Sequence, residues 1–253
     1  MKKYFLILIA GWTLIGCNKQ TAIPSVPPMS SVMVYNSAPE FLGVNASIAF
    51  IDSTGHIDSL VAAYNTIAIS EGNNPYGVGA VASAHYYSMS PGTYRLSFTD
   101  SNRNPLIGGL LQLPRDAHRT IFLADSLGYF STITTNDDVT RTPGSATVRL
   151  INLSPDAGPV DLALDSTTVT GVTGIVYGQI SNFVTVPVTE KSGIRVSTAA
   201  TPAQLLSRKS FPLESGHCYT LILRGYINPP PAEGETESSR LNKTISLSAL
   251  INQ

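Results

Sequence analysis

The stretch Thr93-Tyr94-Arg95-Leu96-Ser97-Phe98-Thr99 alternates polar and apolar residues along its whole length. Successive side chains of a β-strand point to opposite faces, so this period of two predicts a strand whose Tyr94, Leu96 and Phe98 face a core. Other short β-rich runs, punctuated by Gly, Pro, Asn and Ser, cover residues 47–51, 148–151, 160–164 and 184–188. This spacing is typical of a β-sandwich, and the sequence therefore predicts an all-β fold.

Two segments of the chain repeat each other in blocks. Val34-Tyr35-Asn36-Ser37-Ala38-Pro39-Glu40 corresponds to Leu150-Ile151-Asn152-Leu153-Ser154-Pro155-Asp156. Two further blocks match in the same order, residues 91–97 with 192–197 and Thr120-Ile121-Phe122-Leu123 with Thr220-Leu221-Ile222-Leu223. Three matched blocks in one order indicate a duplication, and a period of roughly one hundred residues fits a whole domain better than a solenoid repeat.

A polar stretch from Thr134 to Ser145 separates the two copies. We therefore expect one β-sandwich domain at residues 31–142 and a second at residues 143–253. Each is long enough to bury its own apolar core, because domains of ~100–150 residues are common. The linker is short, which predicts that the two domains touch.

The chain begins with a short positive segment, Met1-Lys2-Lys3, followed by an unbroken apolar run to Gly16. This pattern is typical of a signal peptide, and the run is shorter than the ~20 residues that a transmembrane helix needs. It ends in Leu14-Ile15-Gly16-Cys17, which resembles the lipobox of bacterial lipoproteins. We therefore expect a signal peptide at residues 1–16 and lipidation at Cys17; the alternative is an ordinary cleavage site beside a chance cysteine.

A lipidated Cys17 would hold the mature chain on a membrane, because each buried methylene of an acyl chain contributes ~0.8 kcal/mol. Residues 17–30 then form the anchor and a polar, proline-bearing tether. Asn18, rather than Asp, follows the cysteine, which by resemblance to enterobacterial sorting favours the outer membrane. The sequence leaves open whether the domains face the periplasm or the cell surface.

Charge and cysteine content exclude several other classes. Removal of residues 1–16 takes away two lysines and changes the formal net charge from −1 to −3, so no basic surface is expected to bind nucleic acid. With Cys17 lipidated, Cys218 has no cysteine partner, and the domains cannot rely on an internal disulfide. Because Cys218 begins an apolar run, we expect an inert buried thiol.

One block of the second copy carries a family resemblance. Residues 152–162, Asn-Leu-Ser-Pro-Asp-Ala-Gly-Pro-Val-Asp-Leu, together with residues 177–187, resemble the bacterial lipoprotein family called domain of unknown function 4397. The first copy is degenerate in both regions. The resemblance implies two tandem immunoglobulin-like β-sandwich domains at the envelope of a Bacteroidota-like bacterium, and it implies no activity.

The sequence lacks the motifs of common catalytic chemistry. Gly77-Val78-Gly79-Ala80-Val81-Ala82 imitates a dinucleotide fingerprint, but a strand-like run follows where that fingerprint needs a helix. No Gly-x-Ser-x-Gly elbow is present, and the four histidines, His56, His85, His118 and His217, are not at ligand spacing. We therefore expect no enzyme activity, no cofactor and no metal centre. The acidic residues Asp137-Asp138, Asp156 and Asp161 leave a structural calcium as an open alternative.

Two weaker site predictions remain. The only tryptophan, Trp12, is removed with the signal peptide, so a sugar platform would rely on tyrosines, of which Tyr86 and Tyr87 are the best local pair. Because a strand alternates its faces, only one of the two is expected to point outward. Four Asp-Ser motifs resemble an O-glycosylation acceptor of Bacteroidota. The serines that would carry the glycan are Ser53, Ser59, Ser126 and Ser166. Chance in a Ser- and Thr-rich chain explains these motifs equally well.

These observations favour a lipid-anchored, non-enzymatic module of the cell envelope that presents loops or an edge strand to another protein. The competing hypothesis is a glycan-binding outer-membrane lipoprotein. Reproducible sugar binding that is lost on tyrosine substitution would separate the two.

Overall fold

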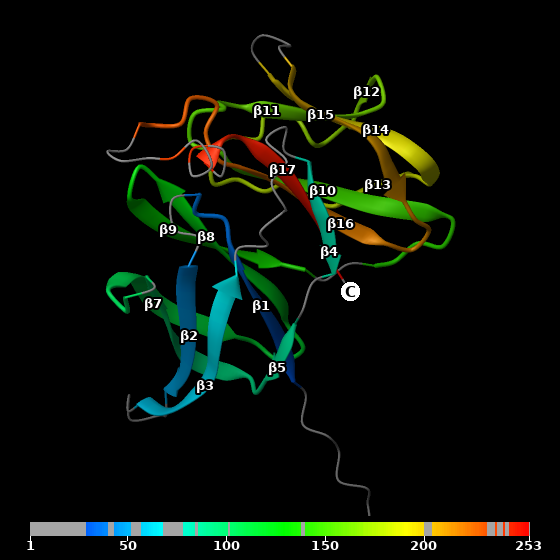
Figure 1. The fold of residues 1–253 in the computed structure, drawn as a ribbon. Helices are drawn as coiled ribbons and strands as arrows, with labels where there is room; N and C mark the ends of the chain where they lie inside the picture. Colours follow the sequence, from blue (N-terminus) through cyan, green and yellow to red (C-terminus); the bar gives the residue numbers. More distant parts are fainter. Residues whose placement is uncertain are drawn as a thin grey trace, which may run out of the picture.

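A computed structural model shows an all-β architecture (Figure 1). It describes residues 29–39, 43–51, 57–67, 78–83, 86–100, 102–137, 140–199, 204–231, 236, 240 and 243–252. The predicted fold class, β-sandwiches in tandem, is confirmed. The proposed signal peptide, Cys17 and most of the tether lie outside the described residues.

The strands before residue 137 form two four-stranded sheets, with one further strand, β4 (Val78–Ser83), that belongs elsewhere. Sheet A has the order β5-β1-β8-β9, with β5 (Tyr87–Met89), β1 (Ser30–Asn36), β8 (His118–Ser126) and β9 (Tyr129–Asn136). Sheet B has the order β3-β2-β6-β7, with β3 (Ile57–Ile67), β2 (Gly43–Ile51), β6 (Gly92–Thr99) and β7 (Pro105–Leu113).

The strands after residue 144 repeat this arrangement. Sheet C has the order β13-β10-β16-β17-β4, with β13 (Val184–Pro187), β10 (Ser145–Leu153), β16 (Cys218–Arg224) and β17 (Ser246–Asn252). Sheet D has the order β12-β11-β14-β15, with β12 (Thr167–Thr168), β11 (Val160–Leu164), β14 (Thr189–Thr198) and β15 (Gln204–Leu213). Apart from β4, the two halves have the same strand order in both of their sheets.

The strand registers support the duplication residue by residue. In sheet A the first strand runs parallel to β8 and pairs Val34 with Ile121. In sheet C the corresponding strand runs parallel to β16 and pairs Leu150 with Leu221. These four residues are the ones that the repeated sequence blocks align, so equivalent blocks occupy equivalent places.

The four sheets stack in the order B, A, C, D, and an apolar core fills each of the three spaces between them (Figure 1). Within β8, Ile121 and Leu123 face sheet B, whereas Phe122 and Ala124 face sheet C. The core between sheets A and C includes Met33, Tyr35, Phe122, Ala124, Ile151, Leu153, Ile222 and Leu250. The two halves are therefore joined by a hydrophobic core of their own, as the short linker predicts.

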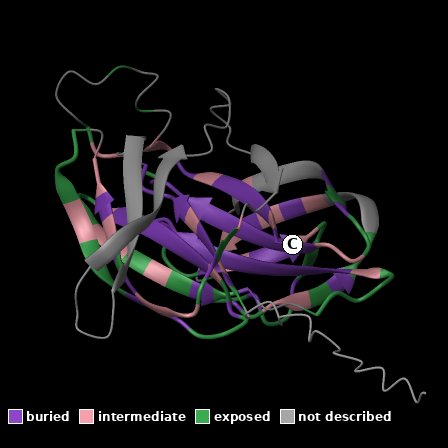
Figure 2. Cartoon of the chain, turned by 90° about the horizontal axis from the view of Figure 1, so that it is seen from below, coloured by how far each residue is buried: buried purple, intermediate pink, exposed green. Residues whose placement is uncertain are grey.

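The middle strands are buried along almost their whole length because sheets A and C are covered on both faces. All seven residues of β16 are buried, and eight of the nine residues of β10 are buried. Figure 2 shows buried strands, in purple, running through the middle of the molecule. Burial of both faces explains why these segments read as apolar runs, whereas β6, which has one covered face, reads as an alternation.

Strand β4 departs from the simple tandem arrangement. It lies in the first half of the sequence, yet it pairs in parallel with β17 at the edge of sheet C, for example Ala82 with Leu250. The glycine-rich segment is therefore itself part of a strand, and not a loop that precedes one. The predicted division into residues 31–142 and 143–253 falls between β9 and β10, and it stays a prediction because β4 crosses it.

Candidate functional site at the junction of the two halves

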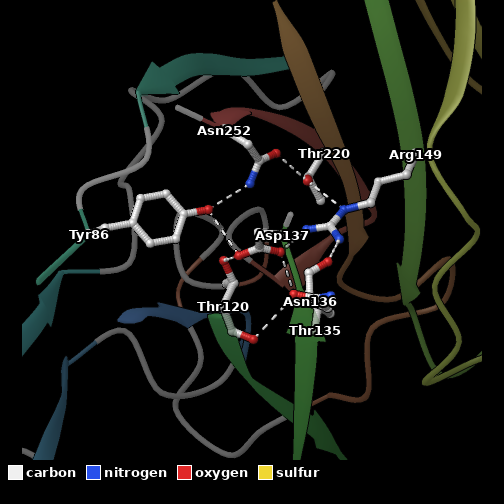
Figure 3. Close-up of polar contacts among 8 residues, drawn as sticks. All are labelled: Tyr86, Thr120, Thr135, Asn136, Asp137, Arg149, Thr220 and Asn252. Atoms are coloured by element: carbon white, nitrogen blue, oxygen red, sulfur yellow. Dashed lines mark hydrogen bonds and ion pairs between the residues drawn. The ribbon is translucent and has the colours of Figure 1, made fainter. Parts of the chain in front are cut away.

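A buried ion pair lies where sheet A meets sheet C (Figure 3). Asp137 follows directly after β9, and Arg149 is in the middle of β10. The guanidinium of Arg149 donates through Nη2 to Oδ1 of Asp137, and the two side chains are 3% and 1% exposed. Two charges this deeply buried need further hydrogen bonds, because removal from water is costly for each of them.

The Asp137 carboxylate is fully hydrogen-bonded. Besides Arg149, Oδ1 accepts a hydrogen bond from the Thr135 hydroxyl at 2.8 Å. The other oxygen, Oδ2, accepts from the hydroxyls of Thr120 at 2.6 Å and Tyr86 at 2.9 Å. A carboxylate offers about four acceptor positions, so this one has none left for an external ligand.

The Arg149 guanidinium is held from three further sides. Its Nε donates to the Thr220 hydroxyl at 2.8 Å, and its Nη1 donates to the carbonyl of Asn136 at 2.9 Å. Its Cζ atom lies 4.2 Å from the centre of the Phe183 ring, which is a cation–π contact. The planar fork of arginine thus binds both halves at once, since Asn136 is on β9 and Thr220 is on β16.

Asn252 closes the cluster into a ring of hydrogen bonds. It accepts from Thr220 at 2.6 Å and donates through Nδ2 to the Tyr86 hydroxyl at 2.9 Å. Burial and the neighbouring charge of Asp137 raise the pKa of Tyr86 from 10.0 to about 12. The Tyr86 hydroxyl therefore keeps its proton at neutral pH and acts as a donor to Asp137.

The cluster is built from equivalent positions of the two halves. Thr120 and Thr220 are aligned by the repeated sequence blocks. The backbone N–H of Asp137 donates to the carbonyl of His118, and Asn252 pairs with Cys218, the residue equivalent to His118. Asp137 and Asn252 therefore occupy equivalent positions. Tyr87 pairs with Val32 on β1, and Val184 pairs with the equivalent Val148 on β10. Tyr86 and Phe183, which directly precede Tyr87 and Val184, are therefore equivalent as well.

The family-like block of the second copy also has a structural explanation. Asn152 donates through Nδ2 to the carbonyls of Gly158 and Ile175 and accepts from the backbone of Ser154. Asp156 accepts from the backbone N–H groups of residues 227 and 228, both at 2.8 Å. These side chains fix loops, and the same turn occurs at Asn36, which accepts from the backbone of Ala38 at 2.9 Å.

The predicted tyrosine pair is divided between two roles. Tyr86 is half-buried and donates to Asp137, whereas Tyr87, on β5, is 41% exposed. The structure therefore does not place both rings on one surface, in agreement with the alternation of a strand. Glycan stacking by the pair is not tested by this arrangement, and stays a prediction.

Two of the predicted O-glycosylation sites lie at hairpin tips. Ser126 ends β8 immediately before the turn residues Leu127 and Gly128, and Ser166 lies in the exposed turn between β11 and β12. The aspartate before each serine accepts a backbone N–H, Asp125 from Gly128 and Asp165 from Gly193. Ser53 lies outside the described residues, and so does the side chain of Ser59.

The remaining acidic and reactive groups are engaged in the fold. Asp161 accepts from the backbone of Gly174 at 2.8 Å, and Cys218 is a buried free thiol 3.3 Å from the Thr147 hydroxyl. Among the described residues no group of three His, Cys, Asp or Glu side chains is arranged to hold a metal ion. Asp138, His56 and His85 lie outside that part of the chain.

Sequence reasoning did not identify the junction. Asp137 was considered only as a calcium ligand, and Arg149, Thr120, Thr220 and Asn252 were not singled out. An arginine within the apolar run of residues 146–151 was the available signal, because a buried strand carries a charge only when that charge is paired.

The family model described as "Domain of unknown function (DUF4397)" matches residues 31–163 and 146–237. The chain belongs to this family. The two matches overlap and together span both halves, so the family membership extends beyond the well-preserved block at residues 152–162. The family's description assigns no activity. No curated protein matches the chain.

Solved structures resemble this chain only distantly. CBMbc (family CBM26) from Eubacterium rectale Amy13K, solved in complex with maltoheptaose, is 14% identical, with 82% of this chain and 99% of that chain covered and a TM-score of 0.24. The tip fimbrial protein Mfa3 from Porphyromonas gingivalis is 9% identical, with 88% and 99% covered and a TM-score of 0.22. Similarity this low says nothing about what the present chain binds.

Proposed function

We propose that this chain is a lipid-anchored, non-enzymatic module of the bacterial envelope that binds another envelope protein through its loops or a sheet edge. The observation that carries the proposal is that the buried ion pair Asp137–Arg149 joins the two halves of the protein. In an enzyme a buried Asp–Arg pair with hydroxyl neighbours would be a candidate for catalysis. Here all four acceptor positions of the carboxylate are taken by groups of the protein itself, and the guanidinium is held by three hydrogen bonds within the protein.

The junction also makes the two halves suitable for carrying a binding surface. A hydrophobic core and a polar cluster hold sheets A and C together across the junction. In a stack of four sheets, the outer faces of B and D, the sheet edges and the hairpin tips remain to meet a partner. Recognition through an edge strand uses the unpaired backbone groups of that strand.

The anchor and the location belong to the same proposal. They rest on the signal-peptide pattern of residues 1–16 and the lipobox ending in Cys17. Among the described residues, no helix combines the length and the apolar character required to cross a membrane. Protease treatment of intact and lysed cells, with a Cys17→Ala variant as control, tests the anchor and the orientation.

The outcomes of that experiment separate the possibilities. Loss of the protein from intact cells supports an outward orientation, and loss only after lysis supports a periplasmic one. Release of the Cys17→Ala variant from the membrane fraction supports lipidation at Cys17. A variant that stays in the membrane fraction as wild type does contradicts it.

The partner class is tested by a pull-down from solubilised envelopes in parallel with a glycan array. Our proposal expects an envelope protein that co-purifies reproducibly and no sugar binding. The alternative, a glycan-binding lipoprotein, is favoured by the exposed ring of Tyr87, one of the two tyrosines predicted to stack on a sugar. Sugar binding that disappears in a Tyr87→Ala variant but not in a Tyr129→Ala variant would replace the first proposal with the second.

A further inference from the structure

The outer edge of β9 has no strand partner in the part of the chain that the structure describes. In sheet A, β9 is the last strand and pairs with β8 (Figure 1). The backbone N–H of Asp137, the residue after β9, donates to the carbonyl of His118 on β8. Because N–H groups alternate in direction along a strand, those of Thr132 and Thr134 point away from β8. Both threonines are exposed, so a row of backbone groups faces outward.

The sequence of β9 lacks the features that usually protect a sheet edge. Its eight residues, Tyr-Phe-Ser-Thr-Ile-Thr-Thr-Asn, include no charged residue and no proline. They pair with β8 in an unbroken register from Tyr129 to Asn136, so no bulge bends the strand away from a newcomer. Natural edge strands are commonly blocked by charges, proline or bulges. This edge is therefore open to a further strand.

In the second half of the molecule the equivalent edge is covered. Leu123 pairs with Thr132 in sheet A, and the aligned Leu223 pairs with Leu247 on β17 in sheet C. Strand β17 thus has the place in sheet C that β9 has in sheet A. Strand β4 runs parallel to β17 and pairs Val78 with Leu247. The molecule itself therefore shows which kind of strand covers this edge.

The two halves differ because only the first gives a strand to the other. Strand β4 ends at Ser83, three residues before Tyr86, and pairs with the second half. The corresponding stretch of the second half precedes Phe183, the residue equivalent to Tyr86, and it stays beside its own first strand. There the N–H of Gly178 donates to the carbonyl of Asn152 on β10 at 2.8 Å. This stretch is thus not available to cover β9.

We propose that the edge of β9 binds an extended, uncharged segment of a partner protein, which adds to sheet A in parallel as β4 adds to sheet C. The inference rests on the proposed function, of which it names the edge and the kind of partner segment. The pattern is that of β4, Val-Gly-Ala-Val-Ala-Ser, a sequence of small and uncharged residues. In this mode of recognition the main-chain hydrogen bonds provide the affinity. The bound segment ends beside the junction, because the outward carbonyl of Asn136 already accepts from Arg149.

Amide hydrogen exchange, followed by NMR, tests whether the edge is open. The sample is residues 17–253 carrying Cys17→Ser. Thr132 and Thr134 should exchange at least about tenfold faster than Ile133, whose N–H points to β8. Equally slow exchange at all three positions would show that another part of the chain covers β9, and it would overturn the inference.

A peptide with the sequence of residues 77–84, which contains β4, is the probe for binding. Added to the same sample, it should slow the exchange of Thr132 and Thr134. Its affinity should be weak, because one strand buries little surface. Changes confined to Leu247 and Ala249 would mean that the peptide replaces β4 beside β17, and they would overturn the inference, as would a failure to bind at millimolar peptide.

Thr134→Pro closes the edge from the side of the protein. It removes an outward N–H without breaking the ladder to β8, and proline is tolerated at such edge positions. The dissociation constant of the peptide should rise about tenfold or more. Thr185→Pro is the matched control, since Thr185 is exposed on the edge strand β13 and faces Thr147, whose N–H donates to His217. The N–H of Thr185 therefore also points away from its sheet, and this variant should bind the peptide as wild type does.

A second measurement leaves the protein unchanged and so does not depend on the folding of Thr134→Pro. The same peptide N-methylated at alternate residues cannot complete a ladder on one of its edges. Of the two possible N-methylation patterns, one should weaken binding about tenfold or more and the other much less. Equal binding of both methylated peptides would overturn the inference, because backbone pairing would not carry the interaction.

The pull-down from solubilised envelopes, repeated with the two proline variants, separates this inference from the proposed function. An envelope protein retained by wild type and Thr185→Pro but lost with Thr134→Pro is the expected result. Equal retention by both variants would overturn the inference and leave the proposed function standing with another surface. A reversible dimer that Thr134→Pro abolishes would also overturn it, because the occupant of the edge would then be a second copy.

Discussion

Asp137 and Asn252 occupy the same position in the two halves of the molecule, but they have opposite tasks. Asp137 accepts four hydrogen bonds around a buried negative charge, whereas Asn252 is neutral and both donates and accepts. Met33 and Arg149, which precede the aligned residues Val34 and Leu150, differ in the same way. The first half supplies the anion of the junction and the second half supplies the cation.

This difference shows how a duplicated face becomes specific for its counterpart. Both halves bury the same face of the same sheet, as the two subunits of a two-fold dimer would. With identical residues, either half could pair equally well with its own kind. Because one half carries Asp137 and the other Arg149, pairing of like halves would bury an unpaired charge, which is strongly unfavourable.

The largest effect is expected for Arg149→Met, which gives the second half the residue that the first half has at the equivalent position, Met33. It leaves Asp137 buried without its cation, so the free energy of unfolding should fall by about 3–5 kcal/mol. Urea denaturation measures the change, with the exposed Arg115→Met as the matched control, expected to stay within about 0.5 kcal/mol.

The double variant Asp137→Asn/Arg149→Met sharpens the same point. It gives each half the other's residue and removes both charges together. We expect it to be more stable than Arg149→Met alone, since an unpaired buried charge costs more than a missing ion pair. Equal stability of the single and double variants would mean that the pair does not couple the halves.

A smaller loss is expected for Asn152→Ala in the preserved block of the second half. Three hydrogen bonds with the backbone disappear, and at about 1 kcal/mol each they predict a loss of roughly 2–3 kcal/mol. Asp156→Ala, which releases only an exposed loop, should cost less. Chemical denaturation of both variants compares their free energies of unfolding. A larger loss for Asp156→Ala than for Asn152→Ala would contradict the structural role assigned to Asn152.

Tyr86→Phe gives the first half the ring that the second half has at Phe183. It should cost about 1 kcal/mol at neutral pH, because the hydroxyl is only partly buried. The pKa of Tyr86 is raised to about 12, so its contribution is complete below pH 10 and is lost as the pH rises through 12. Denaturation at pH 9 and pH 11 should therefore show a smaller alkaline loss for Tyr86→Phe than for wild type.

The smallest effect on stability is expected for Leu110→Ser. Leu110 pairs with Arg95 as Ser207 of β15 pairs with the aligned Arg195, so the change gives β7 the residue at the matching position of β15. The side chain is exposed, so the free energy of unfolding should change by no more than about 0.5 kcal/mol. Thermal denaturation at low protein concentration checks this. A large loss would show that Leu110 belongs to the core of sheet B and not to a free edge.

The fold was predictable from sequence because its signals are local. Alternation in residues 93–99 identifies β6, and the repeated blocks identify the duplication. The junction was not predictable in the same way, because its residues come from distant positions and most differ between the copies. The pairing of β4 with sheet C was also missed, since nothing within residues 78–83 indicates which half they join.

The placement of β17 between β16 and β4 bears on the kinetics of folding. A chain that emerges from its amino end would make β4 long before its only described partner, so that edge must wait for residues 246–252. Pairings this distant in sequence slow folding, since a large loop must close before any contact rewards it. This side of sheet C therefore forms late, and an unfinished chain would carry the unpaired backbone of β4 and of one edge of β16, where a holding chaperone would be most useful.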